Sequence, residues 1–275
     1  MPSPHVAMTI AGTDSGGGAG IAADLKTFAA FKVHGTFAVT AVTAQSTVTV
    51  SAICPIEAEM VTAQVTTVTE DIDVDAVKTG MLARPITVLQ VARLIERGVI
   101  KQVVVDPVLV SSTGHPLMEQ GGVDAYREAL LPQALIATPN LREAALLLGV
   151  DVRDFDSLEA MTEAAEQIRS LGPSWVVLKG GHYLEGGATQ TQAPDILVGD
   201  GVAIHLEAAR VATSNDHGTG CSLAAAITAN VALGLSIPDA VSIAKSYVNK
   251  ALSGAAAWQV GQGHGPIDHL GFESA

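Results

Sequence analysis

The sequence predicts an α/β fold of three layers, in which helices cover both faces of a mainly parallel central sheet. Segments with strand and helix patterns alternate along nearly the whole chain. Short apolar runs such as residues 102–105 are typical of strands that are buried on both faces. The chain has 275 residues, 48% of them hydrophobic and 16% charged, which suits one sizeable core. We therefore expect a single domain over residues 1–275.

The charge and the cysteine content narrow the class of protein. The formal net charge is −13 and the basic residues are scattered, so we expect neither a nucleic acid nor an anionic membrane as a partner. The apolar run at residues 223–235 is too short to span a bilayer. Cys54, Cys221 and the lack of an apolar leader at residues 1–12 favour a reducing compartment, the cytoplasm. We also expect a homodimer.

Runs rich in valine, isoleucine and threonine predict the strands, because these residues fit a pleated sheet. The first strand is closed by Gly12-Thr13-Asp14, and a final hairpin turns at Gly199-Asp200-Gly201. In chain order, the expected strands are residues 6–11, 36–45, 47–56, 76–78, 102–105, 135–138 and 175–178, followed by a hairpin within residues 195–211.

Helices are predicted between these strands from the spacing of apolar residues and from residues that favour helix starts. Pro85 stands at a helix start, where proline is tolerated. Residues 261–275 are expected to form only a tail. The expected helices are residues 21–31, 57–70, 85–97, 124–131, 141–148 and 158–171, with a further small-residue segment at 223–234.

A glycine cluster at residues 15–20 joins the first strand to the first helix. It has neither the lysine of a P-loop nor the glycine spacing of a dinucleotide fingerprint. Gly16, Gly17 and Gly18 would let a ligand approach the backbone closely, although a flexible turn explains them equally well. Asp24, in the first turns of the following helix, could cap backbone donors or accept a hydrogen bond from a ligand amine.

Polar side chains gather where the predicted strands end. In an open parallel sheet, ligands bind beyond the carboxyl ends of the strands. Capping residues could fall anywhere along the chain, so this repeated placement favours an active site. The residues concerned are Asp24, Gln45, Asp106, Asn140, Lys179 and Cys221.

For each of Asp106, Asn140 and Lys179, a structural role explains the residue, and so does a role in ligand binding. Asp106 could hold Mg²⁺ on a nucleotide, or it could cap a turn. Asn140 and Glu143 could face a ligand or a hydrated metal, but they also match a capping box, which their spacing favours at least as much. Lys179, at a glycine-rich strand end, could contact a phosphate or be a solvated loop lysine.

The stretch Ser214-Asn215-Asp216-His217-Gly218-Thr219-Gly220-Cys221-Ser222 is the centre of the predicted site. Its two glycines open onto a helix, so free backbone N–H groups and the positive end of the helix dipole could receive a phosphate. The same dipole is expected to lower the pKa of the Cys221 thiol, which could then act as a base or a nucleophile. The alternative is a tight turn with a buried cysteine.

Seven motifs together resemble the hydroxymethylpyrimidine and phosphomethylpyrimidine kinases of thiamin biosynthesis, in the ribokinase-like superfamily. The resemblance covers almost the entire chain. The motifs are Ile10-Ala11-Gly12-Thr13-Asp14-Ser15-Gly16-Gly17-Gly18-Ala19-Gly20-Ile21, Thr43-Ala44-Gln45, Lys78-Thr79-Gly80-Met81-Leu82, Val105-Asp106-Pro107-Val108, Thr138-Pro139-Asn140-Leu141, Lys179-Gly180-Gly181-His182 and His217-Gly218-Thr219-Gly220-Cys221.

The resemblance implies ATP-dependent phosphorylation of 4-amino-5-hydroxymethyl-2-methylpyrimidine and then of its monophosphate. It implies that Cys221, where most of the superfamily has a catalytic aspartate, acts with Gly218, Gly220 and Lys179 in catalysis. Asp106 and Glu143 would face Mg²⁺. The pyrimidine pocket would be lined by Gly12, Ala19, Asp24, Gln45, Met81 and Val108, and ATP would be bound by Asn140, Lys179, Thr213 and Thr219.

Two positions depart from the pattern of that family. Ser46 and Ala22 stand where asparagine and glutamine are expected, which affects details of substrate contacts more than the reaction. The nearest alternative activity is a pyridoxine or pyridoxal kinase on the same fold, because that substrate is also a flat heteroaromatic ring with a hydroxymethyl group. An alternative that is not an enzyme is a vitamin-binding protein that keeps this fold without catalytic activity. A sugar kinase and a dinucleotide oxidoreductase are less favoured.

Overall fold

A nine-stranded sheet in the order β3-β2-β1-β4-β5-β6-β7-β8-β9 forms the middle layer of the protein. The computed structural model describes residues 3–110, 117–181 and 192–272. The strands are β1 (Val6–Gly12), β2 (His34–Gln45), β3 (Val50–Pro55), β4 (Ala76–Thr79), β5 (Val103–Val105), β6 (Ile136–Ala137), β7 (Trp175–Lys179), β8 (Asp195–Gly199) and β9 (Val202–Leu206).

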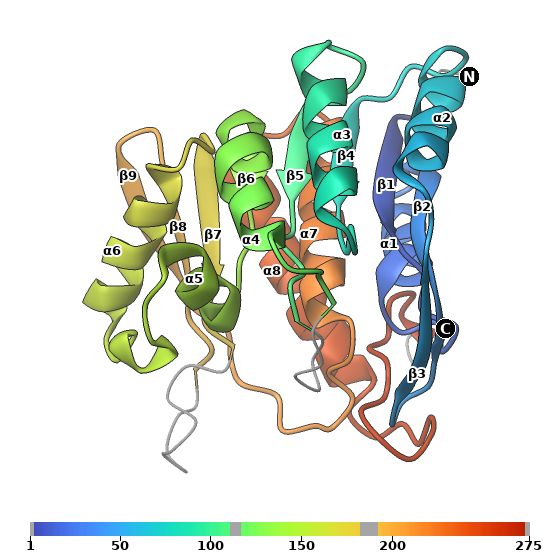
Figure 1. Cartoon of the computed structure of the whole chain (residues 1–275). Coiled ribbons are helices and arrows are strands. Elements are labelled where there is room, and N and C mark those ends of the chain that lie inside the picture. Colours follow the sequence, from blue (N-terminus) through green and yellow to red (C-terminus); the bar gives the residue numbers. More distant parts are fainter. Residues whose placement is uncertain (1–2, 111–116, 182–191, 273–275) are drawn as a thin grey trace.

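Helices cover both faces of this sheet (Figure 1). α2 to α6 lie on one face, whereas α1, α7 and α8 lie on the other. The three-layer α/β prediction is therefore confirmed. The helices are α1 (Gly20–Ala30), α2 (Ala58–Thr69), α3 (Pro85–Glu96), α4 (Gly122–Ala125), α5 (Leu141–Leu148), α6 (Leu158–Arg169), α7 (Thr219–Ala232) and α8 (Ile237–Gly254).

The pairing of the strands brings the ends of the central strands to one edge. β2, β1, β4, β5, β6 and β7 run parallel to one another, while β3 and the β8–β9 hairpin are antiparallel additions at the two sides. Parallel strands that are connected through helices point the same way. The loops after these strands therefore meet on one side of the sheet, where a ligand can reach all of them.

The alanine-rich helix α7 packs closely on the sheet and on α1. Ala224, Ala225, Ala226 and Ala229 are all completely buried, because side chains of this size let the helix approach its neighbours. Phe28 of α1 lies in the same apolar cluster. None of the helices in the described part of the chain combines the length and the apolar character that a membrane span requires.

The segment predicted as one helix at residues 124–131 is not a single regular helix. α4 ends at Ala125, a π-helical turn follows over Tyr126–Leu130, and a 3₁₀ turn covers Leu131–Gln133. Pro132 has no backbone N–H, so it cannot continue an α-helical ladder of hydrogen bonds.

The C-terminal part of the chain is more ordered than the sequence interpretation allowed. That interpretation did not identify α8, although Ser236 accepts the N–H of Asp239 at its start, a recognisable cap. The expectation of a mere tail at 261–275 is wrong for its described residues. Ile267, Asp268 and His269 are buried, because they pack against α7 and α8.

We predict that Phe28→Ala lowers the free energy of unfolding by about 3–5 kcal/mol, because the substitution leaves a cavity under α7. Urea denaturation measures this change. Phe37→Ala is the matched control, since Phe37 of β2 is 47% exposed, and it should cost about 1 kcal/mol or less. Equal losses for the two variants would contradict the packing described for α1.

Candidate active site

A cavity of about 640 Å³ opens at the carboxyl ends of the parallel strands. Its walls come from the loop after β1, the β2–β3 turn, the loops after β4, β5 and β7, and the start of α7. The predicted site residues that line it are Gly12, Ala19, Gln45, Met81, Asp106, Val108, Asn140, Glu143, Lys179, Thr213, Gly218, Thr219, Gly220 and Cys221. His182 lies outside the described residues.

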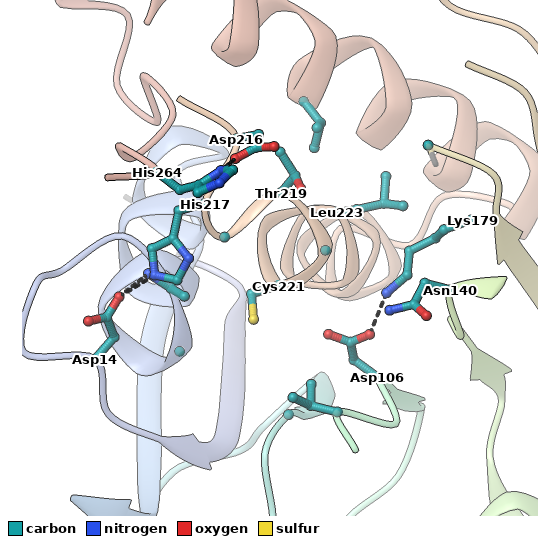
Figure 2. Close-up of a pocket in the computed structure, with 18 of the residues that line it drawn as sticks. Asp14, Asp106, Asn140, Lys179, Asp216, His217, Thr219, Cys221, Leu223 and His264 are labelled. Atoms are coloured by element: carbon teal, nitrogen blue, oxygen red, sulfur yellow. Dashed lines mark hydrogen bonds and ion pairs between the residues drawn. The ribbon is translucent and has the colours of Figure 1, made fainter. Parts of the chain in front are cut away.

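Asp106 and Lys179 form an ion pair on one side of this cavity (Figure 2). Lys179 Nζ lies 2.8 Å from Asp106 Oδ1 and 3.9 Å from Glu143 Oε2. Burial alone would lower the pKa of Lys179, but Asp106 and Glu143 outweigh it and raise the pKa. Lys179 is therefore a fixed positive charge at the strand ends, which suits a phosphate contact.

Asn140 and Glu143 form the capping box that their spacing allowed. The Asn140 side chain accepts the Glu143 N–H at 2.9 Å, and the Glu143 carboxylate accepts the Asn140 N–H at 2.8 Å. Burial raises the pKa of Glu143 to about 7, with Asp106 adding to the rise and Lys179 opposing it. Because Asn140 uses its oxygen in the cap, its amide NH₂ group is the part left for a ligand.

The start of α7 presents backbone N–H groups to the cavity. Gly218 is the N-cap residue and has a φ of 85°, a left-handed conformation that favours glycine. A Cβ on Gly220 would lie 3.2 Å from Lys179 Nζ. The helix start and the Lys179 charge thus face the same space, as an anion-binding site requires. Thr213 and Thr219 flank this start, and the Thr213 hydroxyl accepts the N–H of Asn215 at 2.9 Å.

Cys221 stands between the two halves of the cavity (Figure 2). Our prediction of a lowered thiol pKa is wrong, because burial raises the pKa of Cys221 to about 11. Asp106 and Asp24 add to the rise, while Lys78 opposes it. Cys221 lies in the first turn of α7, where the helix dipole acts, but the dipole does not offset the loss of water around the sulfur. Cys221 is therefore a neutral thiol near neutral pH.

The other half of the cavity suits a flat ring. Met81 and Val108 give it an apolar wall, and the Met81 methyl group lies directly against Gly12, where a Cβ would displace it. The Met81 carbonyl accepts the Thr40 hydroxyl at 2.5 Å, which fixes the loop after β4. Gln45, at the end of β2, supplies an amide at the rim of this wall.

Asp24 does not lie at the surface of the cavity, although the resemblance implied that it lines the pyrimidine pocket. Asp24 is completely buried and is not among the described residues that line the cavity. Both of its oxygens lie 2.8 Å from Lys78 Nζ, and one also accepts the Thr9 hydroxyl at 2.6 Å. This pairing raises the pKa of Lys78 against the opposing effect of burial. Asp24 thus reaches the site only through Lys78, which does line the cavity.

Comparison with known proteins identifies the family. The model of the phosphomethylpyrimidine kinase family matches residues 14–268 of this chain. The chain belongs to this family. It is therefore a phosphotransferase, and the family implies the use of ATP.

Relatives of known name align with this chain over nearly its full length. The chain is 46% identical to the hydroxymethylpyrimidine/phosphomethylpyrimidine kinase of Rhizobium meliloti (strain 1021), over 96% of this chain and 97% of the relative. A structure of phosphomethylpyrimidine kinase from Clostridium difficile 630 has a TM-score of 0.77 and 37% identity, and covers 90% of this chain and 98% of its own. The structure of an ADP complex of Bacillus subtilis pyridoxal kinase has a TM-score of 0.87 and 36% identity, and the match covers 99% of this chain and 100% of that chain.

Two residues of the cavity were missed as site residues in the sequence. Lys78 was noted only as part of a motif, because a lysine on a short apolar strand gives no local sign of its partner. His217 pairs with Asp14, with 2.9 Å between Nε2 and Oδ2. The signal that could have found this pair is that each residue adjoins a glycine loop, and such loops come together at the strand ends.

The carboxylates of the site fit a magnesium ion that is carried by ATP. Within the described ranges there is no group of three or more His, Cys, Asp or Glu side chains arranged to hold a metal. Mg²⁺ is usually bound by one or two carboxylates together with substrate phosphates and water. Asp106 uses Oδ1 for Lys179 and Thr138, so Oδ2 is the atom that could face such an ion. Glu143, whose Oε2 lies 3.9 Å from Lys179 Nζ, is the second carboxylate on this side.

We predict that Cys221 resists alkylation near neutral pH. With a pKa of about 11, roughly one thiol in a thousand is ionised at pH 8, and the thiolate is the reactive form. In a Cys54→Ser protein, the rate with iodoacetamide should keep rising up to about pH 11. The converse Cys221→Ser protein reports on the exposed Cys54. A plateau for Cys221 below pH 8 would mean that the thiol is activated.

Proposed function

We propose that this protein transfers the γ-phosphoryl group of ATP to the hydroxymethyl group of 4-amino-5-hydroxymethyl-2-methylpyrimidine, and then to the resulting monophosphate, in thiamin biosynthesis. One observation carries the proposal. A single cavity holds an apolar ring pocket with Gln45 and Met81, and a phosphate side with Lys179 and the start of α7. Cys221 lies where the two sides meet.

The chain's own groups supply positioning and charge. Phosphoryl transfer needs in-line placement of the two oxygens and stabilisation of charge on the transferred group, and little covalent chemistry from the protein. The N–H groups at Gly218 to Cys221 and the Lys179 ammonium would face that charge. The ring pocket would aim the substrate hydroxyl at the same point. When bound, Mg²⁺ at Asp106 would supply charge neutralisation on the ATP phosphates.

Cys221 is the candidate acceptor of the hydroxyl proton. Because the thiol is neutral in the free protein, this role needs the thiolate form, which becomes more abundant as pH rises toward about 11. In a loose transition state the hydroxyl loses its proton late, so no strong base is needed early. The alternative is that the N–H groups of α7 do most of the work and Cys221 only fills space.

The proposal has three further parts that concern the whole protein. A single domain over residues 1–275 is supported by one sheet that joins strands from residue 6 to residue 206, and by α7, which packs on that sheet and on α8. The acidic net charge of −13 is compatible with a protein that does not bind nucleic acid. We propose that it acts as a homodimer in the cytoplasm, where its unpaired Cys54 and Cys221 would stay reduced.

The direct test of the function is a time course with purified protein, Mg-ATP and the hydroxymethyl pyrimidine, in which monophosphate and diphosphate are separated. Both products should form in that order. Parallel reactions with pyridoxal and pyridoxine test the alternative, since one structural neighbour is a pyridoxal kinase. Binding of the pyrimidine without any product would support a non-catalytic role and would contradict the proposal.

We predict that Asp106→Asn lowers turnover by at least about a hundredfold but leaves pyrimidine affinity nearly unchanged. The substitution keeps the side-chain shape and removes the charge that faces Lys179 and the ATP metal. Steady-state kinetics and calorimetry separate the two effects. Asp75→Asn is a control at the opposite end of the sheet, where the carboxylate pairs with His5. Normal turnover in folded Asp106→Asn protein would reject the assignment of Asp106.

Cys221→Ser tests the proton acceptor. Serine does not ionise in the working pH range, so we predict a loss of about two orders of magnitude in turnover, the usual contribution of acid–base catalysis. Turnover of the wild-type protein should rise with pH more steeply than that of the variant. Cys221→Asp should recover part of the loss, since it restores an ionisable oxygen. If the serine variant keeps the wild-type turnover and pH profile, the cysteine is not the base.

A further inference from the structure

The side chain of His217 has a place that phosphoryl transfer does not explain. His217 directly precedes Gly218, yet its ring points away from Lys179 and toward Asp14 (Figure 2). Its Nε2 atom lies 2.9 Å from Asp14 Oδ2 and 3.3 Å from Gln45 Nε2. One ring nitrogen therefore contacts both the first glycine loop and the residue predicted to recognise the pyrimidine.

The ring of His217 is held firmly in this place. Its backbone N–H donates to the carbonyl of Gly265 at 3.1 Å. A Cβ on Gly18 would lie 2.6 Å from His217 Cδ2, so the ring rests against the backbone of the first glycine loop. The side chain is only 14% exposed. Its two polar neighbours thus meet an imidazole that cannot swing away.

Asp14 decides which atom carries the proton of the imidazole. Its carboxylate accepts the N–H groups of Gly16, Gly18 and Ala19 at 2.8–3.1 Å. Burial alone would raise the pKa of Asp14, but His217 and these N–H groups outweigh it and hold the pKa below its ordinary value. The carboxylate is therefore ionised and needs a donor. Nε2 of His217 supplies it as N–H, a charge-assisted hydrogen bond.

This assignment restricts the orientation of the Gln45 amide. An Nε2 atom that donates to Asp14 has no lone pair for a second group. If the Gln45 NH₂ group faced Nε2 of His217, two donors would point at each other. The Gln45 amide oxygen could instead accept a second, weaker hydrogen bond from the N–H that Nε2 donates to Asp14. A rotation of the terminal amide by about 180° exchanges its oxygen and nitrogen with little change in shape.

We propose that His217, held by Asp14, is a positioning residue that fixes the Gln45 amide with its oxygen toward Nε2 and its NH₂ group directed into the ring pocket. The inference rests on the proposed function, because it specifies how that pocket selects its ring. An NH₂ donor pairs with a ring nitrogen that carries a lone pair, as in a neutral aminopyrimidine. A protonated ring nitrogen would instead point its own N–H at this NH₂ group, and the two donors would repel each other. The pocket therefore favours neutral heteroaromatic rings with an acceptor nitrogen.

A double-mutant cycle tests whether His217 acts through Gln45. The variants are His217→Phe, which keeps a ring and loses the N–H, Gln45→Ala, and the double variant. The affinity for 4-amino-5-hydroxymethyl-2-methylpyrimidine is measured by calorimetry without ATP. Each single variant should raise Kd by about tenfold or more. His5→Phe is the matched control, since His5 also pairs with a carboxylate, Asp75, but at the far end of β1, and its Kd should be unchanged.

The double variant gives the decisive result. If His217 acts through Gln45, the double variant should bind no more than about threefold more weakly than Gln45→Ala. Losses that multiply would show that His217 acts independently, through the Gly218 loop, and would overturn the proposal. So would an unchanged Kd in His217→Phe. His217→Gln, which retains an N–H donor, should restore binding to within about threefold of wild type.

A measurement on the wild-type protein covers the case in which His217→Phe does not fold. Nitrogen-15 NMR, assigned by loss of the signal in His217→Gln, should find Nε2 of His217 protonated at neutral pH. The side-chain NH₂ signals of Gln45 should move when the pyrimidine is added. An unprotonated Nε2 would overturn the inference. A wild-type protein that does not bind the pyrimidine would overturn the proposed function itself, so the two failures are distinguishable.

Discussion

A close approach between two glycine loops from opposite ends of the chain determines the shape of the active site. A Cβ on Gly218 would overlap the carbonyl oxygen of Gly18, and Gly218 also has a left-handed φ of 85°. Only glycine meets both conditions without strain. In the function that we propose, the loop after β1 carries the ring side of the cavity and the loop before α7 carries the phosphate side. This contact would then set the distance between the substrate hydroxyl and the anion site.

Charge is arranged around Cys221 in two lysine–carboxylate pairs. Lys78 and Asp24 are both completely buried, and Lys179 with Asp106 is nearly so. A buried pair of this kind contributes little to stability compared with apolar packing of the same volume, so its value here lies in placing fixed charges. A protein with a net charge of −13 that binds ATP needs such local positive charge. Lys78 and Lys179 both line the cavity, and each is paired with a carboxylate, so the pairs place positive charge there without net charge, and the N–H groups at the start of α7 add uncompensated partial positive charge.

The sequence predicted the parts of the site that depend on local pattern. Asp106 and Lys179 follow apolar strands, and parallel strands bring their carboxyl ends together whatever the side-chain packing is. Long-range properties were not accessible. Asp24 of α1 has its partner 54 residues away on β4, and the pKa of Cys221 depends on burial, which a helix-start motif does not reveal. Gly261, Gly263 and Gly265 fall in a segment that we expected to be only a tail, yet each lies against Thr47 or Asn215.

The raised pKa of Cys221 gives a physical reason for a thiol at this position. Burial raises the pKa of the Cys221 thiol most, Lys78 opposes the rise, and the two carboxylates of Asp106 and Asp24 add to it. A third carboxylate would add like charge in a dry site and would oppose the approach of the ATP phosphates. A thiol loses less hydration free energy on burial than a carboxylate does, and with this raised pKa it is neutral near pH 7. If Cys221 is the base that we propose, a cysteine would keep the site able to accept a polyanion, at the cost of a base that is mostly protonated at rest.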